Sequence, residues 1–204
     1  TQKPSSAASD VYKRQLDDSP LIDKQLLKKI INISDYYMHP IGIVFESFIP
    51  SFLRKAKHQK TLEKYEIKIN SDKTFNNLHT LTRDQKNVLN SIKSKDSGEI
   101  LLSGITSSGK TEVYKHFIKE LLNKGKSALV LVPEIFLTPQ IFNDFQNTFG
   151  NKVLLNHSGL TPIQRIKVWL ASQDKNPKII IGTRSSIFLP ISNLGGIIFD
   201  EEHD

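Results

Sequence analysis

Apolar residues near the beginning of the chain recur with the period of a helix. Between residues 21 and 33 they follow one another at spacings of three and four, which predicts a helix with one apolar face. Ser19-Pro20 supplies a capping residue and a proline suited to the first helical position. His39-Pro40 is expected to end this helix, because the residue before a proline disfavours helical dihedral angles. The apolar stretch Ile41–Ile49 is interpreted as a strand or a short apolar segment.

From residue 81 onward, short apolar runs alternate with stretches of helical period. The predicted strands are 99–103, 127–132, 153–156, 178–182 and 196–200, and the predicted helices are 110–123, 138–148 and 162–171. Thr161-Pro162 opens one helix with a cap and a proline, and Gly125 closes another. Runs such as Ala128–Val132 are apolar throughout, which indicates burial on both faces of a parallel sheet. The sequence therefore predicts an α/β fold with a doubly wound parallel sheet.

A glycine-containing segment joins the first predicted strand of this region to the following helix. Residues 104–111, GITSSGKT, fit the phosphate-binding pattern G-x4-G-K-[ST] in the strand–helix context that it requires. Backbone N–H groups and the helix N-terminus would face the phosphates of a nucleotide. Lys110 is expected to bind the β and γ phosphates, and Thr111 to give its hydroxyl to Mg²⁺. The other candidate nucleotide-binding residues of this loop are Gly104, Thr106, Ser107, Ser108 and Gly109.

Acidic residues follow the last predicted strand, at the end where open α/β sheets bind ligands. Asp200 is expected to hold Mg²⁺ through water, and Glu201 to polarise the attacking water as a general base. His203 would couple this site to movements elsewhere. An acidic strand end alone is more often a solvated surface, but a phosphate loop about 90 residues upstream favours catalysis. Lys110, Asp200 and Glu201 are the candidate catalytic residues.

Several longer motifs resemble one family of enzymes. DEEH (200–203) after an apolar strand is the Walker B form of one group of superfamily 2 helicases. The segments that carry the wider resemblance are SGITSSGKTEVY (103–114), LVPEIFLTPQ (131–140), NHSGL (156–160), IGTRSSIF (181–188) and, upstream, DYYMHPIGIVFESFIPSFLR (35–54). With these, residues 101–204 resemble the first RecA-like domain of the PriA family, the bacterial primosomal replication-restart helicases.

The resemblance implies a domain organisation. Residues 1–15 would be a disordered or artefactual terminus, and 16–54 the end of an N-terminal DNA-binding region. Residues 55–80 would be a linker or a reduced intermediate segment. Residues 81–204 would be a RecA-like P-loop NTPase domain with an incomplete sheet, because the chain ends inside the Walker B motif. We therefore expect a fragment of a larger parent protein.

The resemblance also implies an activity, ATP-dependent 3′-to-5′ unwinding of DNA in replication restart, with ATP and Mg²⁺ as cofactors. Its partners would be single-stranded and forked DNA, single-strand DNA-binding protein and primosome proteins, in the bacterial cytoplasm near the nucleoid. Gln85 occupies the adenine-reading position. The residues expected along the DNA path are Pro133, Glu134, Thr138, Gln140, Thr183, Arg184 and Ser185.

The same resemblance assigns the family's zinc-binding cysteines, the second RecA-like domain and its arginine finger to a downstream part of the parent protein. The fragment alone is accordingly expected to be inactive, because finger contacts contribute roughly 10³–10⁵ in rate.

The amino-acid composition excludes few classes of function. Lys and Arg total 28 against 21 Asp and Glu, and this excess suits either a polyanionic partner or a lysine-rich solvated surface. There are no cysteines and no apolar run of the ~18 residues that a membrane span needs, so a soluble protein is expected. Two alternatives remain open: another superfamily 2 DNA translocase, such as a recombination or restriction motor, and a vestigial, non-catalytic DNA-binding module.

Overall fold

The computed structural model describes residues 21–54, 67, 75, 78–95, 97–104, 108–134 and 139–200. The chain divides into two compact units, Thr1–Tyr65 and Glu66–Asp204. Several sequence predictions lie outside the described residues, namely those for 1–15, Ser19-Pro20, most of 55–80, Thr106, Ser107, Thr138, Glu201 and His203.

The first unit contains helix α2, Lys24–Tyr37. Asp23 caps it, because its carboxylate accepts a hydrogen bond of 2.7 Å from the backbone N–H of Leu26. Met38 ends it in the left-handed region, at a φ of 52°. The predicted end before His39-Pro40 is therefore confirmed.

The second helix of this unit, α3, spans Ile41–Phe48. The prediction of a strand here was wrong. Val44 and Phe48 are four residues apart, lie on one helical face and are both buried. The pattern of a short, largely apolar run is compatible with a buried strand and with a buried helix. In the structure, the four-residue spacing of the buried side chains is that of a helix.

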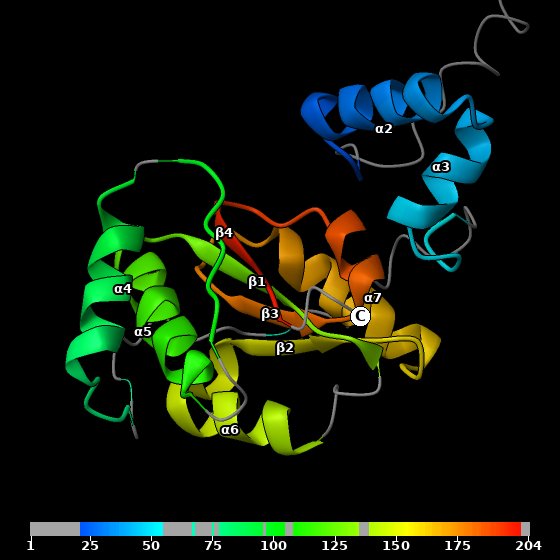
Figure 1. The fold of residues 1–204 in the computed structure, drawn as a ribbon. Helices are drawn as coiled ribbons and strands as arrows, with labels where there is room; N and C mark the ends of the chain where they lie inside the picture. The colour runs from blue at the N-terminus through cyan, green and yellow to red at the C-terminus, as the bar shows by residue number, and fades with distance from the viewer. Residues whose placement is uncertain are drawn as a thin grey trace, which may run out of the picture. The chain divides into compact units, whose positions relative to one another are not determined.

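The second unit is built on a four-stranded parallel sheet (Figure 1). Its strands are β1 (Ser127–Leu131), β2 (Val153–Asn156), β3 (Ile179–Gly182) and β4 (Leu194–Phe199). They lie in the order β2-β3-β1-β4, so β1 pairs with both β3 and β4. Four of the five predicted strands are confirmed, with bounds shifted by at most two residues.

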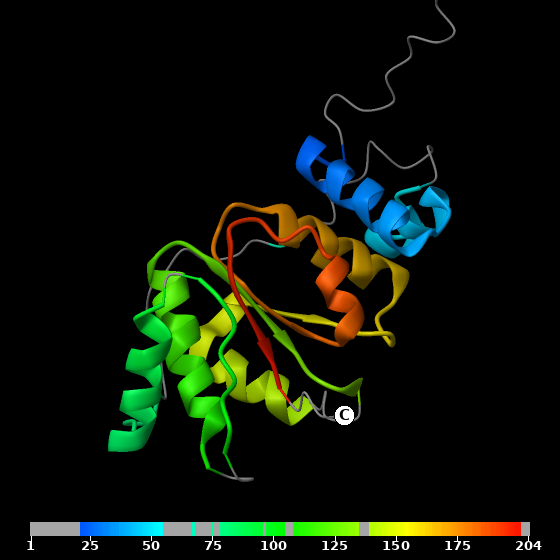
Figure 2. The ribbon, with the colours of Figure 1, turned by 45° about the horizontal axis from the view of Figure 1, so that its top comes forward.

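Helices cover both faces of this sheet (Figure 2). The α-helices are α4 (Arg83–Lys93), α5 (Lys110–Asn123), α6 (Pro139–Phe149) and α7 (Pro162–Gln173), and two 3-10 helices, η3 (Gly150–Lys152) and η4 (Arg184–Phe188), complete the unit. Val130 packs in one core cluster with residues of α5 and α6, whereas its neighbour Leu129 packs in a second cluster with Ala171 of α7. This alternation across the pleat confirms the doubly wound α/β fold.

In the second unit, two elements differ from the sequence predictions. Glu99–Ser103 forms no ladder with any described strand, and Leu101 is 83% exposed, so it is not the predicted buried strand. An extended apolar segment becomes a strand only beside a neighbour with free N–H and C=O groups. The other difference is α4, which the sequence analysis did not predict. Its first turn is a capping box between Thr82 and Gln85.

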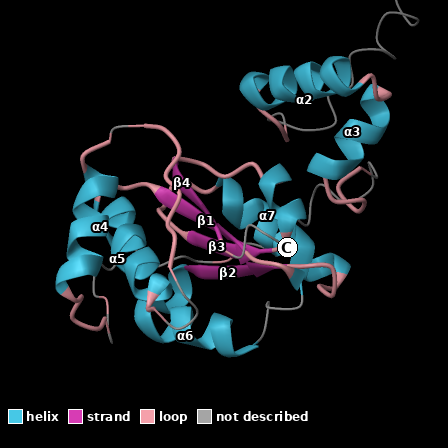
Figure 3. Cartoon of the chain, in the orientation of Figure 1, coloured by secondary structure: helices cyan, strands magenta, loops and turns pink. Residues whose placement is uncertain are grey.

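Strands and helices alternate along the second unit, so each strand of the sheet is followed by a loop at the same edge (Figure 3). Because all four strands are parallel, the segments after β1, β2, β3 and β4 gather at the carboxyl edge. In the described part of the chain, no helix is long and apolar enough to cross a membrane.

Candidate nucleotide site and nucleic-acid interface

The described part of the phosphate loop closes onto the first turn of α5. Gly109 is the N-cap of this helix and has a φ of 79°, a conformation that favours glycine. The Nζ of Lys110 donates a hydrogen bond of 3.0 Å to the carbonyl oxygen of Gly104. The lysine side chain thus reaches back across the loop, where backbone N–H groups at the start of the helix would face an anion.

Gln85 of α4 is in direct contact with this loop. Its Oε1 accepts a hydrogen bond of 2.9 Å from the N–H of Thr82, and its Nε2 donates to the carbonyl oxygens of Ser108 and Gly109 at 3.2 and 3.4 Å. A Cβ added to Gly109 would lie 2.4 Å from that Nε2. Both functional groups of the amide are therefore engaged, one with its own helix and one with the loop.

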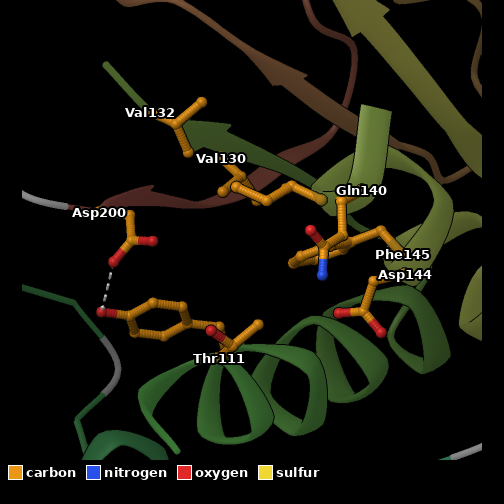
Figure 4. Close-up of a pocket in the computed structure, with 9 residues that line it drawn as sticks. Thr111, Val130, Val132, Gln140, Asp144, Phe145 and Asp200 are labelled. Atoms are coloured by element: carbon orange, nitrogen blue, oxygen red, sulfur yellow. Dashed lines mark hydrogen bonds between the residues drawn. The ribbon is translucent and has the colours of Figure 1, made fainter. Parts of the chain in front are cut away.

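The aspartate after β4 and the threonine of the phosphate loop line one cavity of about 220 Å³ (Figure 4). The residues around it are Thr111, Tyr114, Val130, Val132, Gln140, Ile141, Asp144, Phe145 and Asp200. Asp200 is anchored to the sheet by its own N–H, which donates to the carbonyl oxygen of Leu131 at 2.9 Å.

The donor set of this cavity fits Mg²⁺ bound together with a nucleotide. A threonine hydroxyl and a carboxylate are the oxygen ligands that Mg²⁺ prefers, and phosphates normally supply others. The described residues contain no group of three His, Cys, Asp or Glu side chains able to hold a metal alone. One threonine hydroxyl and one carboxylate suit a cation whose remaining ligands are phosphate and water oxygens.

Sequence reasoning missed Tyr114, Lys115 and Asp144, which lie at or beside this cavity. Tyr114 donates a hydrogen bond from its hydroxyl to Oδ1 of Asp200 at 3.4 Å. Lys115 is 2% exposed, and its Nζ lies 2.8 Å from Asp144 Oδ1 and 3.2 Å from Glu112 Oε1. Tyr114 and Lys115 lie in the first turns of the helix that follows the phosphate loop, but nothing in the sequence pattern links either of them to α6 or to the end of β4.

Hydrogen bonds, two between side chains and one between backbone groups, connect residues at and just after the ends of β1, β2 and β3. The hydroxyl of Ser158 donates to the carboxylate of Glu134. Asn156 Nδ2 donates to Ser186 Oγ at 2.8 Å, and the N–H of Thr183 donates to the carbonyl oxygen of Asn156 at 3.3 Å. These bonds hold three neighbouring loops in one arrangement at the carboxyl edge of the sheet.

The predicted DNA-path residues fall on more than one part of this edge. Thr183, Arg184 and Ser185 form the beginning of η4, where Arg184 and Ser185 are exposed. Glu134 belongs to the joined loops, directly after Pro133. Gln140, by contrast, lines the cavity that contains Thr111 and Asp200.

Comparison with known proteins agrees with this geometry. The sequence profile of the DEAD/DEAH box helicase family matches residues 82–204, more than half of the chain. A curated relative, replication restart protein PriA of Bacillus subtilis, is 40% identical over 162 residues, which are 76% of this chain and 20% of that protein.

Two further relatives carry the same name. PriA of Rickettsia conorii is 36% identical over 185 residues, or 90% of this chain and 27% of that protein. PriA of Synechocystis sp. is 53% identical over 106 residues, or 52% of this chain and 13% of that protein. The chain thus spans between 13% and 27% of the length of these three relatives. By its parallel α/β sheet, its phosphate loop and its profile match, the chain belongs to the DEAD/DEAH box helicase family.

Proposed function

We propose that this chain carries the nucleotide-binding part of an ATP-dependent 3′-to-5′ DNA helicase that acts in replication restart. One observation carries the proposal: Thr111, next to the phosphate-loop lysine, and Asp200, at the end of β4, line the same cavity although they are far apart in sequence. The name that the curated relatives share, replication restart protein, supports the biological role.

Each residue of the site has a separate proposed role in ATP hydrolysis. Bound ATP with Mg²⁺ would supply the phosphoanhydride bond and the countercharge. Lys110 exchanges its bond to the carbonyl oxygen of Gly104 for bonds to phosphate oxygens. Thr111 and Asp200 would hold the cation, Glu201 would accept a proton from the attacking water, and Gly109 would keep the loop close to the phosphates.

The DNA strand would run along the carboxyl edge of the sheet. Arg184 and Ser185 are exposed there at the start of η4, where a guanidinium and a hydroxyl suit contacts to phosphates. Pro133 and Glu134 follow β1 at the same edge, and Thr138 is proposed for the same path from the sequence. Gln140 lines the cavity that also contains Asp200.

The wider setting follows from the same family. Forked and single-stranded DNA are the expected substrates, single-strand DNA-binding protein and primosome proteins the expected partners, and the bacterial cytoplasm the expected location. The arginine finger and the zinc site are expected in other parts of the parent protein.

The proposal is tested by ATP hydrolysis with the protein produced from the complete open reading frame, with and without forked DNA. Hydrolysis should be strongly stimulated by the fork. Lys110→Ala should reduce kcat roughly 10²–10³-fold, because phosphate charge is no longer stabilised. Lys124→Ala, an exposed lysine at the opposite end of α5, should leave the rate unchanged.

The rival functions give other outcomes in the same assay. Hydrolysis that is absent, or indifferent to every DNA tested, would favour a vestigial DNA-binding module. Equal stimulation by blunt duplex and by forked DNA would favour a different superfamily 2 translocase.

A further inference from the structure

The hydroxyl of Tyr114 donates a hydrogen bond to Asp200, the aspartate after β4, and both residues line the cavity described above. Its oxygen is 3.4 Å from Asp200 Oδ1, and the two residues are 86 positions apart in the chain. Tyr114 follows Thr111 by three residues on α5, so both side chains lie on one face of this helix. The helix that begins with the phosphate-binding lysine therefore also reaches the end of β4.

The tyrosine ring is held in place by packing. Tyr114 is half-buried and packs against the core cluster that contains Ile118, Val130 and Ile198. A packed ring has few conformations, so its hydroxyl has a defined position relative to the axis of α5. Asp200, by contrast, lies just beyond the end of β4, with its backbone N–H bonded to Leu131.

A hydroxyl at this position restricts the orientation of the carboxylate. A phenol O–H donates to one carboxylate oxygen and leaves the second oxygen able to accept from water or a cation. At 3.4 Å the bond is long, and hydrogen bonds in catalytic sites commonly tighten in the reacting complex. Replacing the tyrosine with phenylalanine would remove this donor while keeping the ring.

We propose that Tyr114 is a positioning residue that orients Asp200 to hold Mg²⁺, an inference that rests on the nucleotide site proposed above. Thr111 and Tyr114 are on the same helix, so α5 supplies one magnesium ligand and aligns the other. The position of the aspartate carboxylate relative to the threonine hydroxyl is then set by α5 as well as by the backbone bond of Asp200 to Leu131.

The test measures how much Mg²⁺ strengthens nucleotide binding. Fluorescent ADP is titrated against the protein from the complete open reading frame, once with Mg²⁺ and once with EDTA. The quantity compared is the Kd in EDTA divided by the Kd in Mg²⁺. Tyr114→Phe should lower this ratio roughly tenfold, because a hydrogen bond to a charged group is lost. Its affinity in EDTA should stay unchanged. Tyr37→Phe, a 65% exposed tyrosine in the first unit, should behave as wild type in both conditions.

A double-mutant cycle separates positioning from packing. In an Asp200→Asn background, Tyr114→Phe should have no further effect on the ratio, because the group through which it acts has been replaced. If Tyr114→Phe weakens binding equally with and without Mg²⁺, or keeps its full effect in that background, the positioning role is wrong.

The failure of this inference is distinguishable from failure of the proposed function. A wild-type protein whose nucleotide affinity rises with Mg²⁺, together with a Tyr114→Phe variant identical to it, would overturn only the role of Tyr114. A wild-type protein with the same nucleotide affinity in Mg²⁺ and EDTA would contradict the magnesium role of Asp200 and with it the role of Tyr114. A wild-type protein that binds no nucleotide in either condition would contradict the proposed function itself.

Discussion

Gln85 Nε2 donates a hydrogen bond of 3.2 Å to the carbonyl oxygen of Ser108, so α4 directly contacts the phosphate loop. The other end of the same amide accepts from Thr82 and completes a capping box. In this arrangement, Gln85 links the position of the loop to the beginning of a helix that lies earlier in the chain.

We predict that Gln85→Glu weakens nucleotide binding by about tenfold for ATP and GTP alike. The new carboxylate keeps the capping bond but replaces the Nε2 donor with an oxygen that repels the two loop carbonyls. Gln164→Glu is the matched control, because Gln164 forms the same capping box with Thr161 on α7. Competition titrations with both nucleotides measure the effect. A loss confined to ATP would instead identify Gln85 as an adenine-reading residue.

The ion pair between the buried Lys115 of α5 and Asp144 of α6, whose side chain is 50% exposed, is predicted to stabilise the fold. Asp144→Ala leaves the ammonium of Lys115, which is 2% exposed, with Glu112 as its remaining ion-pair partner, and should cost about 1–3 kcal/mol. Lys115→Met, which removes the buried charge at similar volume, should cost less than about 1.5 kcal/mol. Urea unfolding gives both free energies.

The exposed pair Lys93–Glu120 provides the control for this comparison. Its N–O distance is also 2.8 Å, but its side chains are 38% and 39% exposed. Glu120→Ala should therefore cost no more than about 1 kcal/mol. If Asp144→Ala lowered the free energy of unfolding as little as Glu120→Ala does, burial of Lys115 would not determine the strength of its ion pair with Asp144.

Because of Lys178, the free energy of unfolding is predicted to change with pH in the alkaline range. The lysine side chain is fully buried, and this burial lowers its pKa from 10.5 to about 8, although the carboxylate of Asp174 opposes the shift. The unfolded chain thus binds more protons than the folded one between about pH 8 and 10.5, so stability rises with pH in that window. Below pH 8 the burial of the charged form is a constant cost.

The measurement for Lys178 is the difference in unfolding free energy between wild type and Lys178→Met at several pH values from 7 to 10. The wild type should gain roughly 2–3 kcal/mol relative to the variant over this range. Lys175→Met, an exposed lysine three residues earlier, should follow wild type at every pH. A constant difference between wild type and Lys178→Met would contradict the lowered pKa.

Arg184 is predicted to contact a DNA phosphate. Arg184→Ala should weaken binding of single-stranded DNA to a similar extent for every sequence and reduce the salt dependence of log Kd by about one unit. Lys175→Ala removes one charge at the opposite edge of the sheet, before β3, and should change neither quantity. Fluorescence anisotropy at several salt concentrations measures both. An unchanged salt slope for Arg184→Ala would exclude a phosphate contact.

Local signals predicted much of the second unit correctly. Helix α5 begins at Lys110 and ends at Asn123, as expected, because a phosphate loop defines its start and Gly125, at a φ of 71°, follows its end. Thr161 caps α7 in the predicted manner. These features depend on a few adjacent residues, and their chemistry is visible in the sequence itself.

Features that depend on neighbours far along the chain were not predictable. The hydrogen bond between Tyr114 and Asp200 forms only because β4 pairs with β1. The order of strands in a sheet cannot be derived from the sequence pattern. The segment Glu99–Ser103 resembles a strand, but pairing requires an adjacent strand with free backbone groups. The resemblance placed Gln85 at a base-reading position and did not reveal that its amide donates to the phosphate loop.

The most direct test of the central claim is strand separation by the protein from the complete open reading frame. A forked duplex with a labelled strand is incubated with ATP, with a non-hydrolysable analogue, and with the Lys110→Ala variant plus ATP. The account predicts release of the labelled strand only by the wild-type protein with ATP. Release with the analogue or by Lys110→Ala, or no release under any condition, would contradict an ATP-driven helicase built on this site.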